Sequence, residues 1–369
     1  MTRLYAVLFA STCVVVGVLW DISWHVSIGR DSFWTPAHMA IYLGGVIAGL
    51  TCGWLALHVT FAGSPDERAQ AVSFWRVFRA PIGAWVCIWG TIAMLTSAPF
   101  DDWWHNAYGL DVKILSPPHV LLAVGIGAIS YGAMLMAAAH RNRLAGTGTR
   151  LDFLYLYSAA LLLVNASTLG TDYFGRWHMH QSFFYAVCCL VFPFLLVGPA
   201  RAVASGRVRW PATTVAAIFM LIRMALMWIL PLFPAEPGLG PIYVHVDRFL
   251  PPDFPLLLIV PAIAIDLLLR RLEGRKDWQV AFVIAPVFLV TLLAVQWPFA
   301  EFLTTTWARN MFFAAHRMSY MVPPEIQERW YQLNPADNLM RGLPIALVLA
   351  FLSLWRGLKW GGMMGQVRR

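Results

Sequence analysis

The chain has 369 residues, of which 59% are hydrophobic and only 12% charged, and its formal net charge is +8. Soluble globular proteins have about 25% charged residues, so this composition excludes a soluble fold and predicts an all-α, polytopic membrane protein. The positive charge does not indicate a nucleic-acid partner, because the basic residues fall in alternate loops between apolar segments, which is a signal of membrane topology.

Ten apolar segments are expected to form transmembrane helices. The eighth contains Asp266 and the tenth contains Arg356, so these two are the weakest candidates. The first leads directly into Asp21 and His25 without a polar cleavage region, and we expect it to be a retained span rather than a signal peptide. The expected spans are 3–22, 36–62, 81–100, 118–139, 153–171, 180–199, 212–233, 254–271, 280–298 and 343–359.

The loops between these segments are of two kinds. One kind is short and rich in arginine, and the positive-inside rule places these loops and both termini in the cytoplasm, which predicts a bacterial cytoplasmic (inner) membrane protein. The other kind faces outward and carries the histidine motifs. The basic loops are 63–80, 140–152, 200–211 and 270–278, and the outward loops are 20–36, 100–118, 171–180, 234–253 and 299–342.

The loops and spans predict one integral-membrane domain, 1–369, built from repeated helical hairpins. Residues 1–140 contain two matching hairpins, and residues 141–278 contain two degenerate copies. Residues 279–369 contain the last spans, with an outward loop at 299–342 that is long enough to form a small cap. Internal duplication is the simplest explanation of this pattern.

Both matching hairpins carry the pattern Asp-x2-Trp-His-x3-Gly-x-Asp, followed by Thr or Ser, Pro and a second His. The two copies lie 80 residues apart for the first five positions of the pattern. In the first copy these residues are Asp21, Trp24, His25, Gly29, Asp31, Thr35, Pro36 and His38, and in the second they are Asp101, Trp104, His105, Gly109, Asp111, Ser116, Pro117 and His119.

The spacing of each copy predicts a cluster of one carboxylate and two imidazoles. Asp21 and His25 are four residues apart and therefore share one face of a helix. Thr35 and Pro36 are typical of a helix start, which places His38 in the first turn of the next span. The same argument applies to Asp101, His105 and His119.

Asp with two His is a ligand set suited to iron, copper or zinc, and we predict a metal site at each copy. The alternative is an ordinary hydrogen-bonded pair at the end of each helix. Candidates for positions around the ligands are Trp24, Arg30, Asp31, Asp102, Trp104 and Asp111, of which Asp31 and Asp111 are suited to orienting an imidazole. The third hairpin contains Asp172, His178 and His180, which are either further ligands or relics of the duplication.

The run from Asp21 to His38 resembles the C subunit of copper membrane monooxygenases, the particulate methane and ammonia monooxygenases. That subunit has an Asp-His-His copper triad with spacings of four and thirteen, and a second triad, usually beginning with Asn, with spacings of four and fourteen. The resemblance covers roughly residues 15–140. The chain departs from the family in having Asp101 in place of Asn, about ten spans in place of about six, and no large soluble domain like that of the B subunit.

The resemblance implies a copper-dependent membrane oxidoreductase with one or two copper ions. It would use dioxygen to hydroxylate a small apolar substrate or ammonia, with partner subunits or an electron donor, in contact with membrane lipid. The alternatives are a non-catalytic copper-binding or transport protein, and a zinc-dependent membrane hydrolase in which Asp31 or Asp111 acts as general base.

Overall fold

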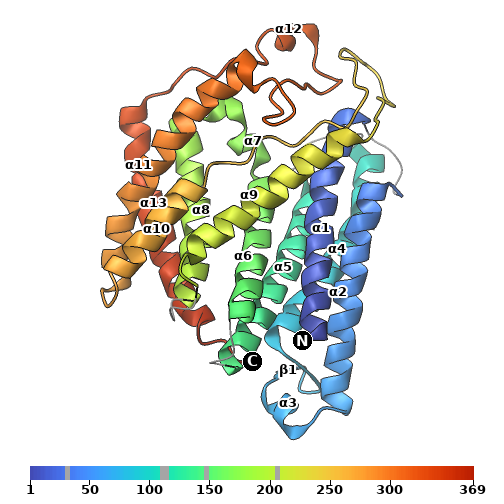
Figure 1. Ribbon diagram of the computed structural model, residues 1–369. Helices are drawn as coiled ribbons and strands as arrows, with labels where there is room; N and C mark the ends of the chain where they lie inside the picture. The colour runs from blue at the N-terminus through green and yellow to red at the C-terminus, as the bar shows by residue number, and fades with distance from the viewer. Residues whose placement is uncertain (30–33, 109–115, 145–148, 204–207) are drawn as a thin grey trace. The chain divides into compact units, whose positions relative to one another are not determined.

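The computed structural model describes residues 1–29, 34–108, 116–144, 149–203 and 208–369. The protein is an all-α polytopic membrane protein, as predicted (Figure 1). In the described part of the chain, nine helices are long and apolar enough to cross a bilayer. Each corresponds to one of the spans expected from the sequence, and several extend a turn or more beyond it.

The eighth span, expected at 254–271, is shorter in the structure than predicted. Its helix, α10, runs only from Ile259 to Arg271. Thirteen residues of helix are about 20 Å long, whereas the hydrocarbon core of a bilayer is about 30 Å thick. The segment before it includes Pro251, Pro252 and Pro255. In addition, the main-chain N–H of Leu257 donates to the side-chain oxygen of Gln296 instead of to a helical carbonyl.

The chain, predicted as one domain, divides into two compact units, each drawn from several parts of the sequence. The first contains Met1–Gly17, Met39–Asn165 and Met363–Arg369, and the second contains Val18–His38 and Ala166–Gly362. Each matching Asp-His-His set therefore lies within a single unit: Asp21, His25 and His38 in the second, and Asp101, His105 and His119 in the first. The two units are described separately below.

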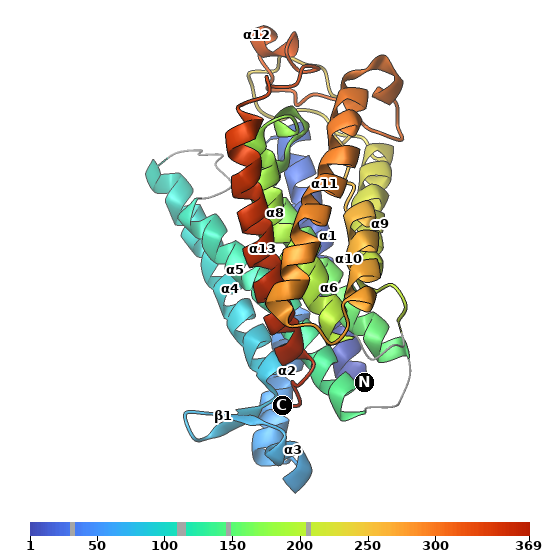
Figure 2. The ribbon, with the colours of Figure 1, turned by 90° about the vertical axis from the view of Figure 1, so that its left-hand side faces the viewer.

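The first unit contains most of the N-terminal helices and a small two-stranded sheet (Figure 2). The strands form an antiparallel hairpin in which Phe74 pairs with Phe78. Its elements are the greater part of α1 (Thr2–Ser27), nearly all of α2 (Pro36–Phe61), α3 (Pro65–Ala69), β1 (Val72–Phe74), β2 (Phe78–Ala80), α4 (Ile82–Tyr108), α5 (Pro117–Arg143) and the greater part of α6 (Thr149–Leu169).

Helices α4 and α5 run side by side and meet through glycines (Figures 1 and 2). A Cβ atom on Gly90 would lie 2.7 Å from the carbonyl oxygen of Gly125, and a Cβ on Gly125 would lie 2.7 Å from that of Gly90. Gly83 and Gly132 meet in the same reciprocal way, at 2.6 Å. Because small residues let helix backbones approach closely in a membrane, these two pairs hold the α4–α5 hairpin together.

The second unit contains the end of α1, the start of α2, the end of α6 and the remaining helices. The N-terminal N–H groups of α9 at Ala212 and Thr213 donate to the carboxylate of Asp266 on α10. Its other elements are α7 (Thr171–Phe174), η1 (Arg176–His178), α8 (Ser182–Ala202), α9 (Pro211–Ile229), η2 (Leu230–Leu232), α10, α11 (Asp277–Thr304), η3 (Thr306–Ala308), α12 (Pro324–Gln327) and nearly all of α13 (Leu339–Met364).

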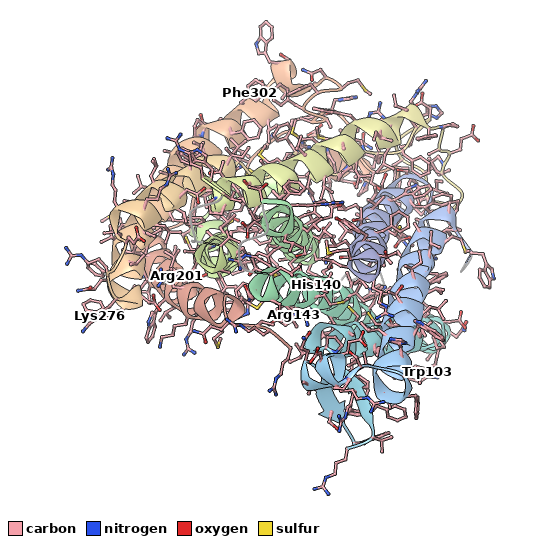
Figure 3. All side chains as sticks on the ribbon, turned by 60° about the horizontal axis from the view of Figure 1, so that its bottom comes forward. Trp103, His140, Arg143, Arg201, Lys276 and Phe302 are labelled. Atoms are coloured by element: carbon pink, nitrogen blue, oxygen red, sulfur yellow. The ribbon has the colours of Figure 1, made fainter. Side chains whose placement is uncertain are left out.

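Charged residues in the second unit gather where α8 ends and α11 begins. Arg201 lies 3.9 Å from Asp277, and Figure 3 shows Arg201 near Lys276, the residue that precedes α11. In the first unit, His140 and Arg143 lie close together near the end of α5 (Figure 3). Both groups belong to loops that the sequence analysis assigned to the arginine-rich set.

Replacing Gly125 with Ala is expected to destabilise the protein by about 1–3 kcal/mol, because the new methyl group would overpack the contact with Gly90. Gly127, on the same helix, has open space where its Cβ would lie. Gly127→Ala is therefore the matched control, and the higher helix propensity of alanine makes it neutral or stabilising. Thermal unfolding in detergent measures the stability of both variants. Equal losses of stability in Gly125→Ala and Gly127→Ala would contradict the close α4–α5 contact.

Candidate metal centres

The first candidate centre joins the end of α1 to the first turn of α2. Asp21 and His25 share one face of α1, with 3.6 Å between Asp21 Oδ2 and His25 Nε2. His38 approaches from α2, with its Nε2 3.1 Å from Asp21 Oδ1. The structure thus brings together the three residues that the sequence analysis predicted as one ligand set.

The opposite face of α1 is held by the loop before α10. Ser23 lies two residues from both Asp21 and His25, and Ser27 lies two residues from His25. Each serine therefore points about 200° around the helix axis from these candidate ligands. The Ser23 hydroxyl donates to the carbonyl of Leu250 at 2.5 Å, and the N–H of Leu250 donates to the Ser27 hydroxyl at 2.8 Å. These bonds fix the rotation of the helix end, and therefore the direction in which Asp21 and His25 point.

The last turn of α1 ends at a glycine that the fold requires. Gly29 has a φ of +100°, which favours glycine over other residues. A Cβ there would also collide with the hydroxyl of Tyr320 in the loop 299–342. In the same region, Ser319 donates to the carbonyl of Val26 at 3.0 Å. The loop predicted to be a cap thus contacts the end of α1.

The second candidate centre joins the end of α4 to the first turn of α5. Asp101 and His105 share one face of α4, with 3.5 Å between Asp101 Oδ1 and His105 Nε2. His119 Nε2 lies 3.4 Å from the same carboxylate oxygen. The pattern 80 residues along the chain therefore brings together the same three kinds of ligand, although here both imidazoles approach the same carboxylate oxygen.

The distances in both centres are those of ligands sharing an ion. Two ligand atoms about 2.0–2.2 Å from one metal ion, at a tetrahedral angle, lie about 3.3–3.6 Å apart. The four carboxylate–imidazole distances run from 3.1 to 3.6 Å, and three exceed the usual 2.7–3.2 Å of a hydrogen bond. In each set, one donor atom from every residue lies within 4.8 Å of the others.

A second observation concerns one carboxylate oxygen in each centre. Asp21 Oδ1 and Asp101 Oδ1 are both shielded from solvent, and neither forms a hydrogen bond of acceptable geometry with the described residues. Imidazole Nε2 atoms of the same triad lie next to each oxygen, at 3.1 Å for Asp21 and 3.4–3.5 Å for Asp101, and a cation bound between them would stabilise the buried carboxylate. The donor set and these two oxygens therefore fit a metal ion at each centre.

The residues predicted to surround the ligands differ in their contacts. Trp24 packs against Phe249, with ring centroids 5.4 Å apart, and Trp104 packs against Tyr108 at 4.5 Å. Asp102 is exposed and accepts a hydrogen bond from the Asn106 side chain. The other three predicted neighbours lie outside the described residues: Arg30, Asp31 and Asp111.

The indole rings next to the ligands repeat between the two copies. Trp24 Nε1 and Trp104 Nε1 are both buried, and neither forms a hydrogen bond within the described chain. Each indole thus has a buried, unused donor and is the neighbour in sequence of a candidate metal-ligating histidine.

The third hairpin places its candidate ligands in separate surroundings. Asp172 is exposed on α7. His178 Nδ1 lies 2.7 Å from the side-chain oxygen of Gln181. His180 stacks on Trp297 with centroids 3.9 Å apart, and its Nε2 lies 3.2 Å from the Trp297 carbonyl oxygen. In the described part of the chain, only the two matching triads form a group suited to a metal. A ligand role for the third hairpin stays a prediction.

The start of α8, just beyond the third hairpin, is held by the C-terminal part of the chain. Asp337 accepts hydrogen bonds from the main-chain N–H and the hydroxyl of Ser182, each at 2.7 Å. Burial raises the pKa of Asp337, but these hydrogen bonds outweigh it, and the pKa lies below its ordinary value. The carboxylate therefore stays charged to lower pH and continues to cap the helix.

The supporting residues of the first centre were not predicted from the sequence. Ser23 and Ser27 carry a weak signal, since they are two polar residues four apart on the face opposite Asp21 and His25. Nothing in the local sequence identifies their partner Leu250, which lies 227 residues beyond Ser23. The glycine pairs of α4 and α5 have a clearer signal, a spacing of seven residues on each helix.

Comparisons with protein-family models, with curated proteins and with solved structures find no match for this chain. The function of the protein is therefore inferred from the two centres and from the family resemblance of their residues.

The residues before α2 and α5 differ in whether they cap the helix, so we expect their substitution by alanine to have different effects on metal binding. Thr35 Oγ1 accepts a hydrogen bond from the N–H of His38 at 3.1 Å, whereas the buried Ser116 hydroxyl forms no capping bond at the start of α5. Thr35→Ala is expected to cost about 1 kcal/mol and to weaken metal binding at the first centre up to about fivefold. Ser116→Ala is expected to leave the second centre unchanged. Competition titration with a metal chelator measures the metal affinity of both variants. Equal losses of affinity in Thr35→Ala and Ser116→Ala would contradict the capping role of Thr35.

Proposed function

We propose that the protein is a copper-dependent membrane oxidoreductase that uses dioxygen to hydroxylate a small apolar substrate or ammonia. The observation that carries the proposal is the repeated triad, in which one carboxylate lies 3.1–3.6 Å from two imidazole Nε2 atoms. The choice of copper and of oxygen chemistry comes from the resemblance of residues 15–140 to the C subunit of copper membrane monooxygenases.

Each residue of a triad has a defined task. His25, His38, His105 and His119 would supply Nε2 donors, and imidazole is a common ligand of copper, iron and zinc. Asp21 and Asp101 would supply one anionic oxygen each and offset part of the charge of the ion. Three protein ligands leave coordination positions open, and copper bound there would supply dioxygen and one-electron chemistry.

The surroundings of the triads suit a site that receives small molecules and electrons. The ligand side chains are 13–39% exposed, so neither centre is sealed within its helices. The ligands lie at helix ends, where a charged group costs less than at the middle of a bilayer. Reduction of dioxygen consumes electrons from outside the centre, so we propose that an electron donor or partner subunits act with this chain.

Purified protein in detergent is expected to contain copper at both centres, two ions per chain. His25→Ala is expected to remove one ion and Asp101→Ala the other, because each change deletes one of three ligands. Asp102→Ala is the matched control for Asp101→Ala, since Asp102 is the next residue, is exposed and accepts a hydrogen bond from Asn106. Elemental analysis, with electron paramagnetic resonance for Cu(II), measures the result.

The outcomes of this measurement separate the candidate functions. Zinc in place of copper would support a zinc-dependent membrane hydrolase. Copper without reductant-dependent oxygen uptake, in the presence of small apolar substrates or ammonia, would support a copper-binding or transport protein. Folded protein that binds no metal, with Asp101→Ala indistinguishable from Asp102→Ala, would mean that both triads are structural.

We also propose that both termini lie in the cytoplasm and that the two centres face outward. The support is the clustering of arginine in alternate loops. A green fluorescent protein fused after Arg369 is expected to fluoresce, and alkaline phosphatase at the same position is expected to be inactive. Alkaline phosphatase inserted in the loop 299–342 is expected to be active. The reverse pattern of activities would overturn the proposed orientation.

A further inference from the structure

The β1–β2 hairpin of the first unit is fixed in place by contacts with two helices. Trp85 on α4 donates its indole N–H to the carbonyl of Val72 at 3.1 Å. The N–H of Arg79 donates to the hydroxyl of Thr60 in the last turn of α2 at 2.8 Å. Figure 2 shows the hairpin extending sideways from the ends of these helices. The hairpin is thus a defined structural element.

Aromatic residues connect the hairpin to the surface of α4. Phe74 contacts Trp75, Trp85 and Trp89, with ring centroids 4.8, 5.2 and 5.6 Å apart. Trp89 is 50% exposed and lies in a helix apolar enough to cross the membrane. The aromatic surface therefore continues without a break from the hairpin to the lipid-facing side of a span.

The tip of the hairpin exposes large apolar side chains. Trp75 is 77% exposed and Val77 is 57% exposed. Helix α4 has 27 residues and is about 40 Å long, close to the thickness of a bilayer with its headgroups. Its start at Ile82, two residues after the hairpin, therefore lies at headgroup depth, where tryptophan is enriched in membrane proteins.

The backbone of the tip is strained. Trp75 and Arg76 have φ values of +49° and +62°, in the left-handed region that residues with a Cβ seldom adopt. Asn-Gly would form the same turn at a lower cost. Strain of this kind is found where a side chain is held for a function, and here it holds an exposed tryptophan beside an arginine.

The charge of the hairpin is entirely positive. Arg76 and Arg79 are both exposed, and residues 72–80 contain no carboxylate. The nearest acidic residues in the sequence, Asp66 and Glu67, lie on α3, where Glu67 is bound to Ser64 in a capping box. An arginine pair beside exposed tryptophan matches a surface of anionic phospholipid, which attracts basic segments next to membrane spans.

We propose that the hairpin Val72–Ala80 is an interfacial anchor that binds anionic phospholipid, with Trp75 and Val77 inserted among the headgroups and Arg76 and Arg79 bound to lipid phosphates. The inference rests on the membrane class of the protein and is independent of the metal centres. It gives the first unit a fixed depth in the membrane at the end where α2 stops and α4 begins.

The first test measures the depth of the hairpin. A spin label is attached at Val77→Cys in a Cys13→Ser background, because Cys13 is the partly exposed native cysteine and the other four are buried. In vesicles of phosphatidylglycerol and phosphatidylcholine at about 3:7, the label is expected to be more accessible to oxygen than to a water-soluble nickel chelate. Asp66→Cys, on exposed α3, is the control and should show the opposite order. Equal nickel accessibility at both positions would overturn the proposal.

The second test separates lipid binding from a structural role. The variant Trp75→Asn, Arg76→Gly relieves the backbone strain and is expected to melt a few degrees higher than the native protein in neutral detergent. Native protein is expected to melt several degrees higher in nanodiscs containing phosphatidylglycerol than in phosphatidylcholine alone, and the variant is expected to lose that difference. Arg368→Gln, an exposed arginine at the C-terminus, should retain it. A variant with the native response to phosphatidylglycerol would overturn the proposal.

Discussion

The hydrocarbon core of a bilayer offers no hydrogen-bond partners, and the rest of the structure follows from that constraint. Every backbone N–H and C=O within the core must be satisfied by the chain itself, which leaves helices as the solution for apolar segments of this length. The same constraint confines charged chemistry to helix ends. Both Asp-His-His centres lie there, where the last turn of one helix meets the first turn of the next.

One local pattern is held by two different kinds of support. In the second unit, the hydroxyls of Ser23 and Ser27 form hydrogen bonds with the backbone of Leu250 and fix the end of α1. Gly29, which has no Cβ, leaves room there for the side chain of Tyr320. In the first unit, α4 and α5 are fixed against each other by glycine pairs. The ligand atoms nevertheless reach similar separations. This agreement between independent supports favours a shared requirement of the site itself over an accident of packing.

Several polar groups that enter the interior are satisfied in pairs or networks. Asp266 binds the start of α9 through two main-chain N–H groups. Ser130 joins Ser11 and Asn165 through hydrogen bonds of 2.7 and 2.9 Å. Asp21 and Asp101 each have one shielded carboxylate oxygen without a hydrogen bond of acceptable geometry, and in each case the imidazoles of a triad lie next to it. Groups of this kind cost free energy unless a ligand completes them, which is why they carry the metal hypothesis.

The sequence by itself determined the membrane class, nine of the spans and the membership of both triads. It could do so because hydropathy acts through local composition, and because an i, i+4 pair followed by a Thr-Pro or Ser-Pro start is local geometry. It failed at 254–271, where the helix begins only at Ile259, after three prolines and after Leu257, whose N–H donates to the side chain of Gln296. Only the tertiary structure decided the division into two units, the clamping of α1 by Leu250 and the separate surroundings of His178 and His180. These features depend on contacts between residues far apart in the chain, and the local sequence does not specify which distant residue a side chain will contact.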